Sequence, residues 1–231
     1  MIKNKSIVAG FLFVISSIIT IPINAQGWNC FTNSCKSDQR HWTINLNAGT
    51  TSCFGDLSIF DNHPLQKIQD ESGLAFGIIG TRYFNNIIGL SAQVLTGKMN
   101  ASLNSISFQS SFIEYNLHGR VNLLGFINKF NDSKFKWEVY AGAGQLLYQT
   151  SKSMNNGSDS NPNLHQTQVP EFVYFFGSGI SYTILPCITI TTDLALRQCQ
   201  TDRLDNYVKN DDYDYYSYLN FGISYNFCKR N

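Results

Sequence analysis

The sequence predicts an all-β fold, an eight-stranded antiparallel up-and-down transmembrane β-barrel. Apolar and polar residues alternate with a period of two along most of the chain, the pattern of strands with two different faces. Only 14% of the residues are charged and 14% are aromatic, as a lipid-facing wall between aromatic rims requires. The 17 Lys and Arg residues nearly balance the 16 Asp and Glu residues, so nothing indicates a nucleic-acid partner.

An export signal begins the chain. Lys3 and Lys5 precede the apolar stretch 7–21, and a small residue, Ala25, follows shortly after it. This order is typical of a signal peptide cleaved after Ala25. The alternative, a membrane anchor, needs about 20 apolar residues. The expected division is 1–25 signal peptide, 26–40 N-terminal periplasmic segment and 41–231 barrel domain.

Eight segments carry the alternation expected of strands. The fourth is the clearest, because Ile113, Tyr115 and Leu117 share one face while polar residues occupy the other. The eight predicted strands are 42–49, 75–84, 88–94, 113–123, 137–144, 171–182, 188–197 and 218–227.

The connections between these strands alternate in length. The turns at Asn85–Asn86 and around Pro186 are tight, and 125–134 is intermediate. Long loops at one rim and short turns at the other are typical of outer-membrane barrels, with the long loops extracellular and the termini periplasmic. The long polar connections are 52–73, in which 64–71 suits a short helix, 98–107, 151–169 and 198–214.

The direction of each face decides between two kinds of barrel. A soluble, lipocalin-like ligand-binding barrel encloses its apolar face, whereas a membrane barrel exposes it to lipid. The polar faces here consist mainly of Asn, Gly, Ser, Thr and Tyr with isolated charges, as in a packed lumen. Because buried charges must be paired, we expect a neutralising lumen network. Its predicted members are Glu114, His118, Arg120, Glu138, Glu171, Asp193 and Arg197.

The last strand carries a terminal pattern. Asn220 is followed by Gly222, and Tyr225 and Phe227 complete the order polar, x, Gly, x, x, apolar, x, aromatic. This order resembles the signal by which the barrel-assembly machinery recognises outer-membrane proteins. We therefore expect that machinery as a partner during biogenesis, with outer-membrane lipid and other envelope proteins as later partners.

The mature region resembles the small outer-membrane β-barrel families of Bacteroidota and, in architecture, the eight-stranded OmpA-type transmembrane domain. The segments that carry this resemblance are 54–57 (FGDL), 170–177 (PEFVYFFG) and the final strand. In contrast to full-length OmpA-type proteins, we expect no peptidoglycan-binding domain after the barrel. A PorG-like barrel associated with type IX secretion is a more specific relative that no motif singles out.

The sequence offers little evidence of catalysis. His118 is the one histidine inside a predicted strand; it has no evident Ser or Asp partner, and no G-x-S-x-G pattern occurs. The acidic run 210–214 lacks the Gly and Glu of an EF-hand, which favours a solvated loop tip over a metal site. We expect no catalytic residues, no metal and no cofactor.

Six cysteines allow several disulfides in an oxidising compartment. Cys187 opens the seventh predicted strand and Cys228 follows the eighth, so antiparallel pairing puts both at the periplasmic rim. They form the candidate disulfide, while Cys30 and Cys35 are a second close pair. A bridge between Cys53 and Cys199 is less favoured, because their strands are not neighbours.

The leading functional hypothesis is a non-enzymatic barrel of the cell outer membrane. It would serve in envelope integrity, surface interaction or as a subunit of an envelope complex. The alternatives are a subunit associated with type IX secretion, an outer-membrane enzyme acting on lipid or peptide, and the soluble lipocalin-like barrel.

Overall fold

The computed structural model describes residues 41–54, 72–103, 106–127, 133–154, 163–166, 170–200 and 214–227. The predicted signal peptide, the segment 26–40, the helix at 64–71 and Cys228 lie outside these residues. In the described part of the chain, no helix has the length and hydropathy to cross a membrane.

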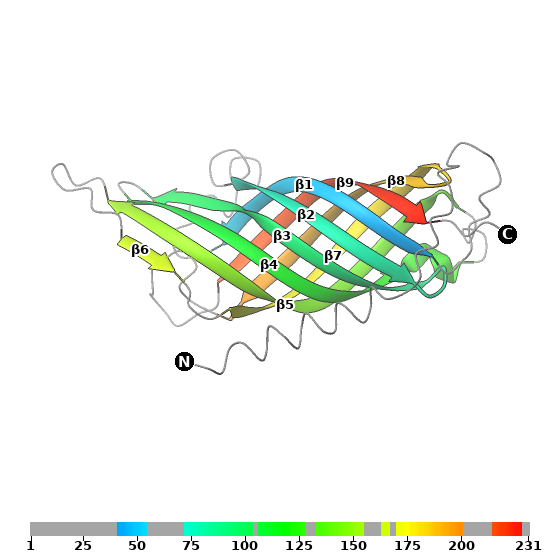
Figure 1. The fold of residues 1–231 in the computed structure, drawn as a ribbon, viewed down its shortest axis with the longest axis horizontal. Coiled ribbons are helices and arrows are strands. Elements are labelled where there is room, and N and C mark those ends of the chain that lie inside the picture. Colours follow the sequence, from blue (N-terminus) through cyan, green and yellow to red (C-terminus); the bar gives the residue numbers. More distant parts are fainter. Residues whose placement is uncertain are drawn as a thin grey trace.

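The described residues form strands and one short helix (Figure 1). Neighbouring strands pair antiparallel, and β1 pairs with β9 to close the sheet. The elements are β1 (Trp42–Phe54), β2 (Ser72–Tyr83), β3 (Ile88–Leu103), β4 (Ile106–Asn122), the 3-10 helix η1 (Leu123–Phe126), β5 (Phe135–Met154), β6 (Asn163–Gln166), β7 (Glu171–Leu185), β8 (Ile188–Cys199) and β9 (Tyr215–Phe227).

Eight of these strands form the closed barrel, which confirms the predicted fold class. The remaining strand, β6, falls within the connection predicted at 151–169. It pairs with the far end of β5, from Gln149 to Lys152, beyond the part of β5 that pairs with β7. It therefore extends the sheet on one side without entering the barrel wall.

The strands are longer than the sequence predicted, mainly at the end with the long connections. The segment 98–107 was predicted as a loop, and this is wrong: β3 and β4 stay paired up to Leu103 and Ile106. At the other end, Leu123 belongs to η1 and not to the fourth strand. The side chain of Asn122 caps η1 by accepting from the backbone N–H of Leu124 at 3.2 Å.

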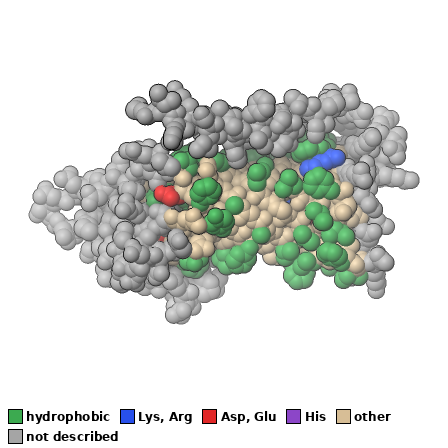
Figure 2. Space-filling view, turned by 90° about the horizontal axis from the view of Figure 1, so that it is seen from below, with side chains coloured by type: hydrophobic (Ala, Val, Ile, Leu, Met, Phe, Trp, Pro, Cys, Tyr) green, Lys and Arg blue, Asp and Glu red, His purple; other side chains and the backbone are tan. Residues whose placement is uncertain are grey.

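The barrel wall is apolar outside. Large hydrophobic side chains project from every strand of the closed barrel, with Leu46 59% and Phe221 66% exposed. Figure 2 shows such side chains spread over the barrel surface. The same alternation turns polar residues inward, and Asn45, Gln93, Asn116 and Ser224 are buried. The period-two pattern therefore predicted the faces correctly over this part of the wall.

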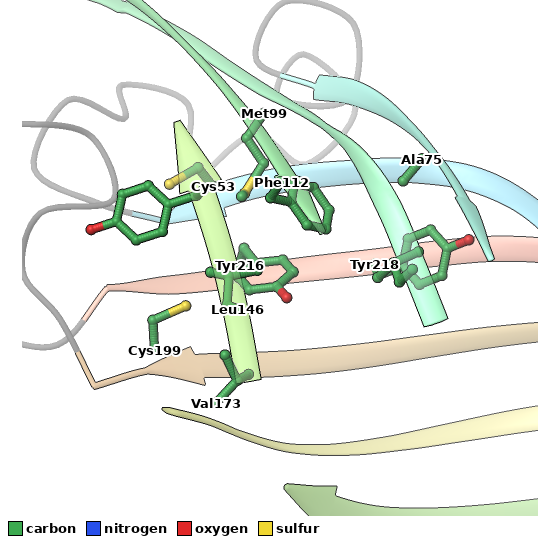
Figure 3. Close-up of a cluster of buried hydrophobic side chains, with 11 residues drawn as sticks. Cys53, Ala75, Met99, Phe112, Leu146, Val173, Cys199, Tyr216 and Tyr218 are labelled. Atoms are coloured by element: carbon green, nitrogen blue, oxygen red, sulfur yellow. The ribbon is translucent and has the colours of Figure 1, made fainter. Parts of the chain in front are cut away.

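The interior near the long connections is different. Figure 3 shows an apolar cluster there, with side chains from both sides of the barrel. The apolar cluster consists of Cys53, Ala75, Leu95, Met99, Phe112, Leu146, Tyr148, Val173, Cys199, Tyr216 and Tyr218.

The wall around the apolar cluster is mixed in polarity, because polar side chains are exposed on β3, β4 and β5 whereas Leu147 on β5 and Phe172 on β7 are apolar and exposed. On β3, Leu95 and Met99 are buried whereas Thr96 and Lys98 are exposed. Gln109 and Ser111 on β4 and Gln149 on β5 are likewise exposed. At this end the interior is therefore more apolar, and the outer face of β3, β4 and β5 more polar, than in the rest of the barrel.

Candidate functional site

The lumen between the apolar cluster and the short turns holds the buried charges. Glu114, His118 and Arg120 project from β4, Glu138 from β5, and Asp193 and Arg197 from β8. All six side chains are buried. Residues two apart on a strand share a face, so one barrel wall delivers consecutive charges to one column of the lumen.

Arg197 and Glu114 form the first ion pair, next to the apolar cluster on its short-turn side. Arg197 donates from Nη1 to the Glu114 carboxylate and from Nη2 to Gln93 Oε1 at 3.1 Å. The Glu114 carboxylate also accepts from the Tyr216 hydroxyl and, at 2.6 Å, from Asn116 Nδ2. Arg197 Cζ lies 4.6 Å from the centroid of the Phe175 ring, which adds a cation–π contact.

Arg120 forms the second ion cluster, nearer the short turns. Its Nη1 lies 3.1 Å from Glu138 Oε2 and 3.5 Å from Asp193 Oδ1. The Tyr83 hydroxyl donates to the other Glu138 oxygen at 2.8 Å. The Arg120 guanidinium also lies 4.7 Å from the Tyr140 ring centroid. The Arg120 guanidinium thus links β4, through ion pairs, to carboxylates on β5 and β8.

His118 joins the two clusters. Its Nε2 accepts from Arg120 Nε at 3.2 Å, so the ring proton belongs on Nδ1, which donates to Asn116 Oδ1 at 3.0 Å. The Tyr140 and Phe175 rings pack against the imidazole, with centroids 5.3 and 5.5 Å away. Alternate residues of β4, from Glu114 to Arg120, therefore form one hydrogen-bonded ladder along the lumen.

A small polar cavity lies between the Arg120 cluster and the short-turn rim. Its volume is about 30 Å³, enough for about two water molecules. Hydroxyl groups dominate its lining, from Thr43, Thr81, Thr189, Thr191 and Ser224 among others. Beyond it, the Arg120 cluster, the Arg197 pair and the apolar cluster fill the lumen in turn.

The contacts of the lumen network differ from the predicted set in detail. Glu171 is half-buried at the start of β7 and forms no ion pair with any residue that the structure describes. Tyr83, Gln93, Asn116 and Tyr216 take part although only charged residues were predicted. Gln93 and Asn116 lie on the polar faces read from the sequence, but Tyr216 lies before the predicted start of its strand.

The terminal pattern occupies both faces of β9. Asn220 is buried, and Gly222 faces Asn45, whose Nδ2 would lie 2.7 Å from an added Cβ and would have to shift. Phe227 is exposed on the outer face, and its ring packs edge-on against that of Tyr225, with centroids 5.1 Å apart. Recognition of this strand by the assembly machinery stays a prediction.

Cys187 and Cys199 lie in different environments. Cys187 is disulfide-bonded, and its carbonyl accepts from the backbone N–H of Asn226 at 2.8 Å. This contact puts the start of β8 beside the end of β9, where Cys228 follows. Because Cys228 lies outside the described residues, the pairing stays a prediction. Cys199 is a buried free thiol in the apolar cluster.

No metal site is apparent among the described residues, where no three His, Cys, Asp or Glu side chains gather suitably. Asp214, the last residue of the acidic run, is buried, and its backbone carbonyl accepts from the backbone N–H of Cys199 at 2.9 Å. The expectation of a solvated tip is therefore wrong for Asp214.

Comparison with known proteins finds similarity in fold only. No family model matches the chain, and no curated protein matches it. Among solved structures, Ail, the attachment invasion locus protein of Yersinia pestis, has a TM-score of 0.49 and 13% identity, over 82% of this chain and 100% of Ail. Neisserial surface protein A gives 0.48 and 13%, over 80% and 97%. A major outer membrane protein from Thermus thermophilus gives 0.48 and 10%, over 80% and 99%.

Proposed function

We propose that the chain is a non-enzymatic β-barrel of the outer membrane that spans the bilayer with a closed lumen. The observation that carries this proposal is the apolar exterior around a buried, ion-paired interior. Exposed apolar surface on this scale is unfavourable in water, and it is what a bilayer requires. In a closed barrel the backbone N–H and C=O groups of each wall strand pair with neighbouring strands, which is the condition for placing strands in lipid.

The filled lumen supports a structural or interaction role over transport. An eight-stranded barrel has room for its own side chains and little else. Both ring nitrogens of His118 are occupied by Asn116 and Arg120, which leaves no free base for catalysis at this position. The barrel thus serves in envelope integrity, in surface interaction through its long connections, or as a subunit of an envelope complex such as a type IX secretion assembly.

Fractionation tests the membrane assignment. The mature protein is expected in the outer-membrane fraction, and it should migrate differently in detergent gels before and after boiling, because the closed barrel resists detergent until heated. Recovery in the soluble periplasmic fraction after gentle lysis would contradict the proposal and favour the lipocalin-like alternative.

The orientation of the barrel is tested by surface labelling. Single cysteines replacing Ser158 or Lys209, in the long connections of an otherwise Cys-free protein, are expected to react with an impermeant reagent in intact cells. The matched control is Lys134→Cys at the short-turn rim, where Lys134 is exposed. It should react only after lysis, and the reverse pattern would invert the proposed topology.

A further inference from the structure

Arg82 is a cation on the otherwise apolar outer face of β2. It shares the outward phase of β2 with Leu74, Phe76 and Ile78, all more than half exposed. In the described part of the structure no carboxylate pairs with it, whereas both lumen arginines are paired. Its one described partner is the ring of Trp42, whose centroid lies 5.3 Å from Cζ. The guanidinium donors are therefore available to a ligand outside the barrel.

The depth of Arg82 matches a headgroup. From Leu74 to Arg82 the strand rises by eight residues, which in a barrel tilted by about 40° spans roughly 20 Å of membrane thickness. The apolar band of such barrels is about 25 Å tall. Arg82 and Trp42 pair directly in the β1–β2 register. Both lie close to the short turns, and the exposed apolar side chains beyond them on this wall are Phe84 and Ile88.

The short-turn rim is basic among its described residues. Lys134 is exposed there, and Lys136 is half-exposed at the mouth of the lumen cavity, with Nζ 5.0 Å from the Tyr83 ring centroid. The nearest described carboxylates, Glu138 and Asp193, are buried in the Arg120 cluster. An anionic surface therefore meets cations and no exposed described carboxylate at this rim.

We propose that Arg82, oriented by Trp42, binds the phosphate of an anionic phospholipid in the periplasmic leaflet. Guanidinium groups recognise phosphate oxygens with two parallel hydrogen bonds, and tryptophan is enriched at membrane–water interfaces. The inference rests on the proposed membrane placement. It adds a specific lipid contact that fixes the depth of the barrel at the β1–β2 wall.

Lipid-dependent quenching of Trp42 tests the site. Trp28→Phe and Trp137→Phe leave Trp42 as the one tryptophan of the three. This protein is reconstituted into mixtures of brominated and plain lipid, with either phosphatidylglycerol or phosphatidylcholine brominated. Trp42 is expected to select phosphatidylglycerol about fivefold, the preference that one basic residue gives at an anionic surface. Arg82→Leu should abolish the preference, and Arg82→Lys should retain part of it.

The controls separate the possible failures. Lys98→Leu, an exposed cation at the opposite end of the wall, should leave the preference unchanged. Equal quenching by both brominated lipids would overturn the lipid site while leaving the membrane barrel intact. No quenching by either lipid would remove the barrel from the bilayer and both proposals with it. Loss of the preference in excess inorganic phosphate, but not in chloride of equal ionic strength, would show a free-phosphate site and overturn the lipid assignment.

Discussion

Glu114→Leu is expected to lower the free energy of unfolding by about 3–5 kcal/mol. Arg197 is 1% exposed, and Glu114 is its one carboxylate partner among the described residues. Removing that carboxylate leaves a buried guanidinium uncompensated. It also removes the acceptor of the hydrogen bonds that the Tyr216 hydroxyl and Asn116 Nδ2 donate to Glu114. Urea unfolding of the protein in lipid vesicles, followed by tryptophan fluorescence, measures the effect.

A double-mutant cycle separates the ion pair from general packing. Glu114→Leu/Arg197→Leu should be less destabilised than the sum of the two single variants, because neither charge is then left unpaired. Gln109→Leu, on the exposed face of the same strand, is the matched control and should change stability by less than about 0.5 kcal/mol. If the single variants were as stable to unfolding as this control, the lumen charges would not be paired in the folded barrel.

Gly49→Ala is expected to destabilise the barrel by about 1–3 kcal/mol or to block its closure. Gly49 lies in β1 opposite Asn220 of β9, at the seam that closes the sheet. A Cβ added there would overlap the backbone carbonyl of Leu219 and lie 2.6 Å from Asn220 Cα. Because backbone atoms cannot rotate away, the seam itself must open. The measurement is the fraction of protein that keeps the heat-modifiable migration.

Gly80→Ala is the control for a glycine in the same barrel. A Cβ at Gly80 meets nothing within 4 Å. Alanine there should be neutral or slightly stabilising, because glycine in a strand costs about 0.5–1 kcal/mol relative to alanine. Equal loss of folded barrel in both variants would mean that glycine content, and not the close approach at the seam, limits assembly.

The sequence predicted the strands well where one face meets an apolar surrounding. Alternation located all eight barrel strands, and it placed residues such as Glu114, Arg120 and Asp193 on the inward face. It failed at 98–107, because this stretch is rich in polar residues and its composition resembles a loop. Period two persists through Leu95, Thr96 and Lys98, but the apolar phase has moved inside.

The contacts between side chains within the lumen could not be predicted from the local sequence pattern. The Arg197–Glu114 pair joins residues 83 positions apart in the chain, and the Tyr216 contact spans 102. Period two states which way a side chain points but not which strand it faces across the barrel. Glu171 shows the same limit, because it shares the phase of Val173 but lies at the end of its strand and forms no ion pair with the described residues.

The polar residues on the outer face of β3, β4 and β5 beside the apolar cluster lie past the continuous apolar band of the proposed membrane barrel. In the lipid-facing part, bilayer thickness dictates how many residues each strand needs. Past that level, in the proposed membrane placement, the wall meets water and the apolar cluster stabilises it from inside. The height of this end of the barrel is therefore less constrained by the bilayer than that of the lipid-facing part. Hairpins such as β3–β4 can lengthen or shorten in steps of two residues and keep their faces. The distance between the long connections and the bilayer can thus change without altering the fit of the lipid-facing part.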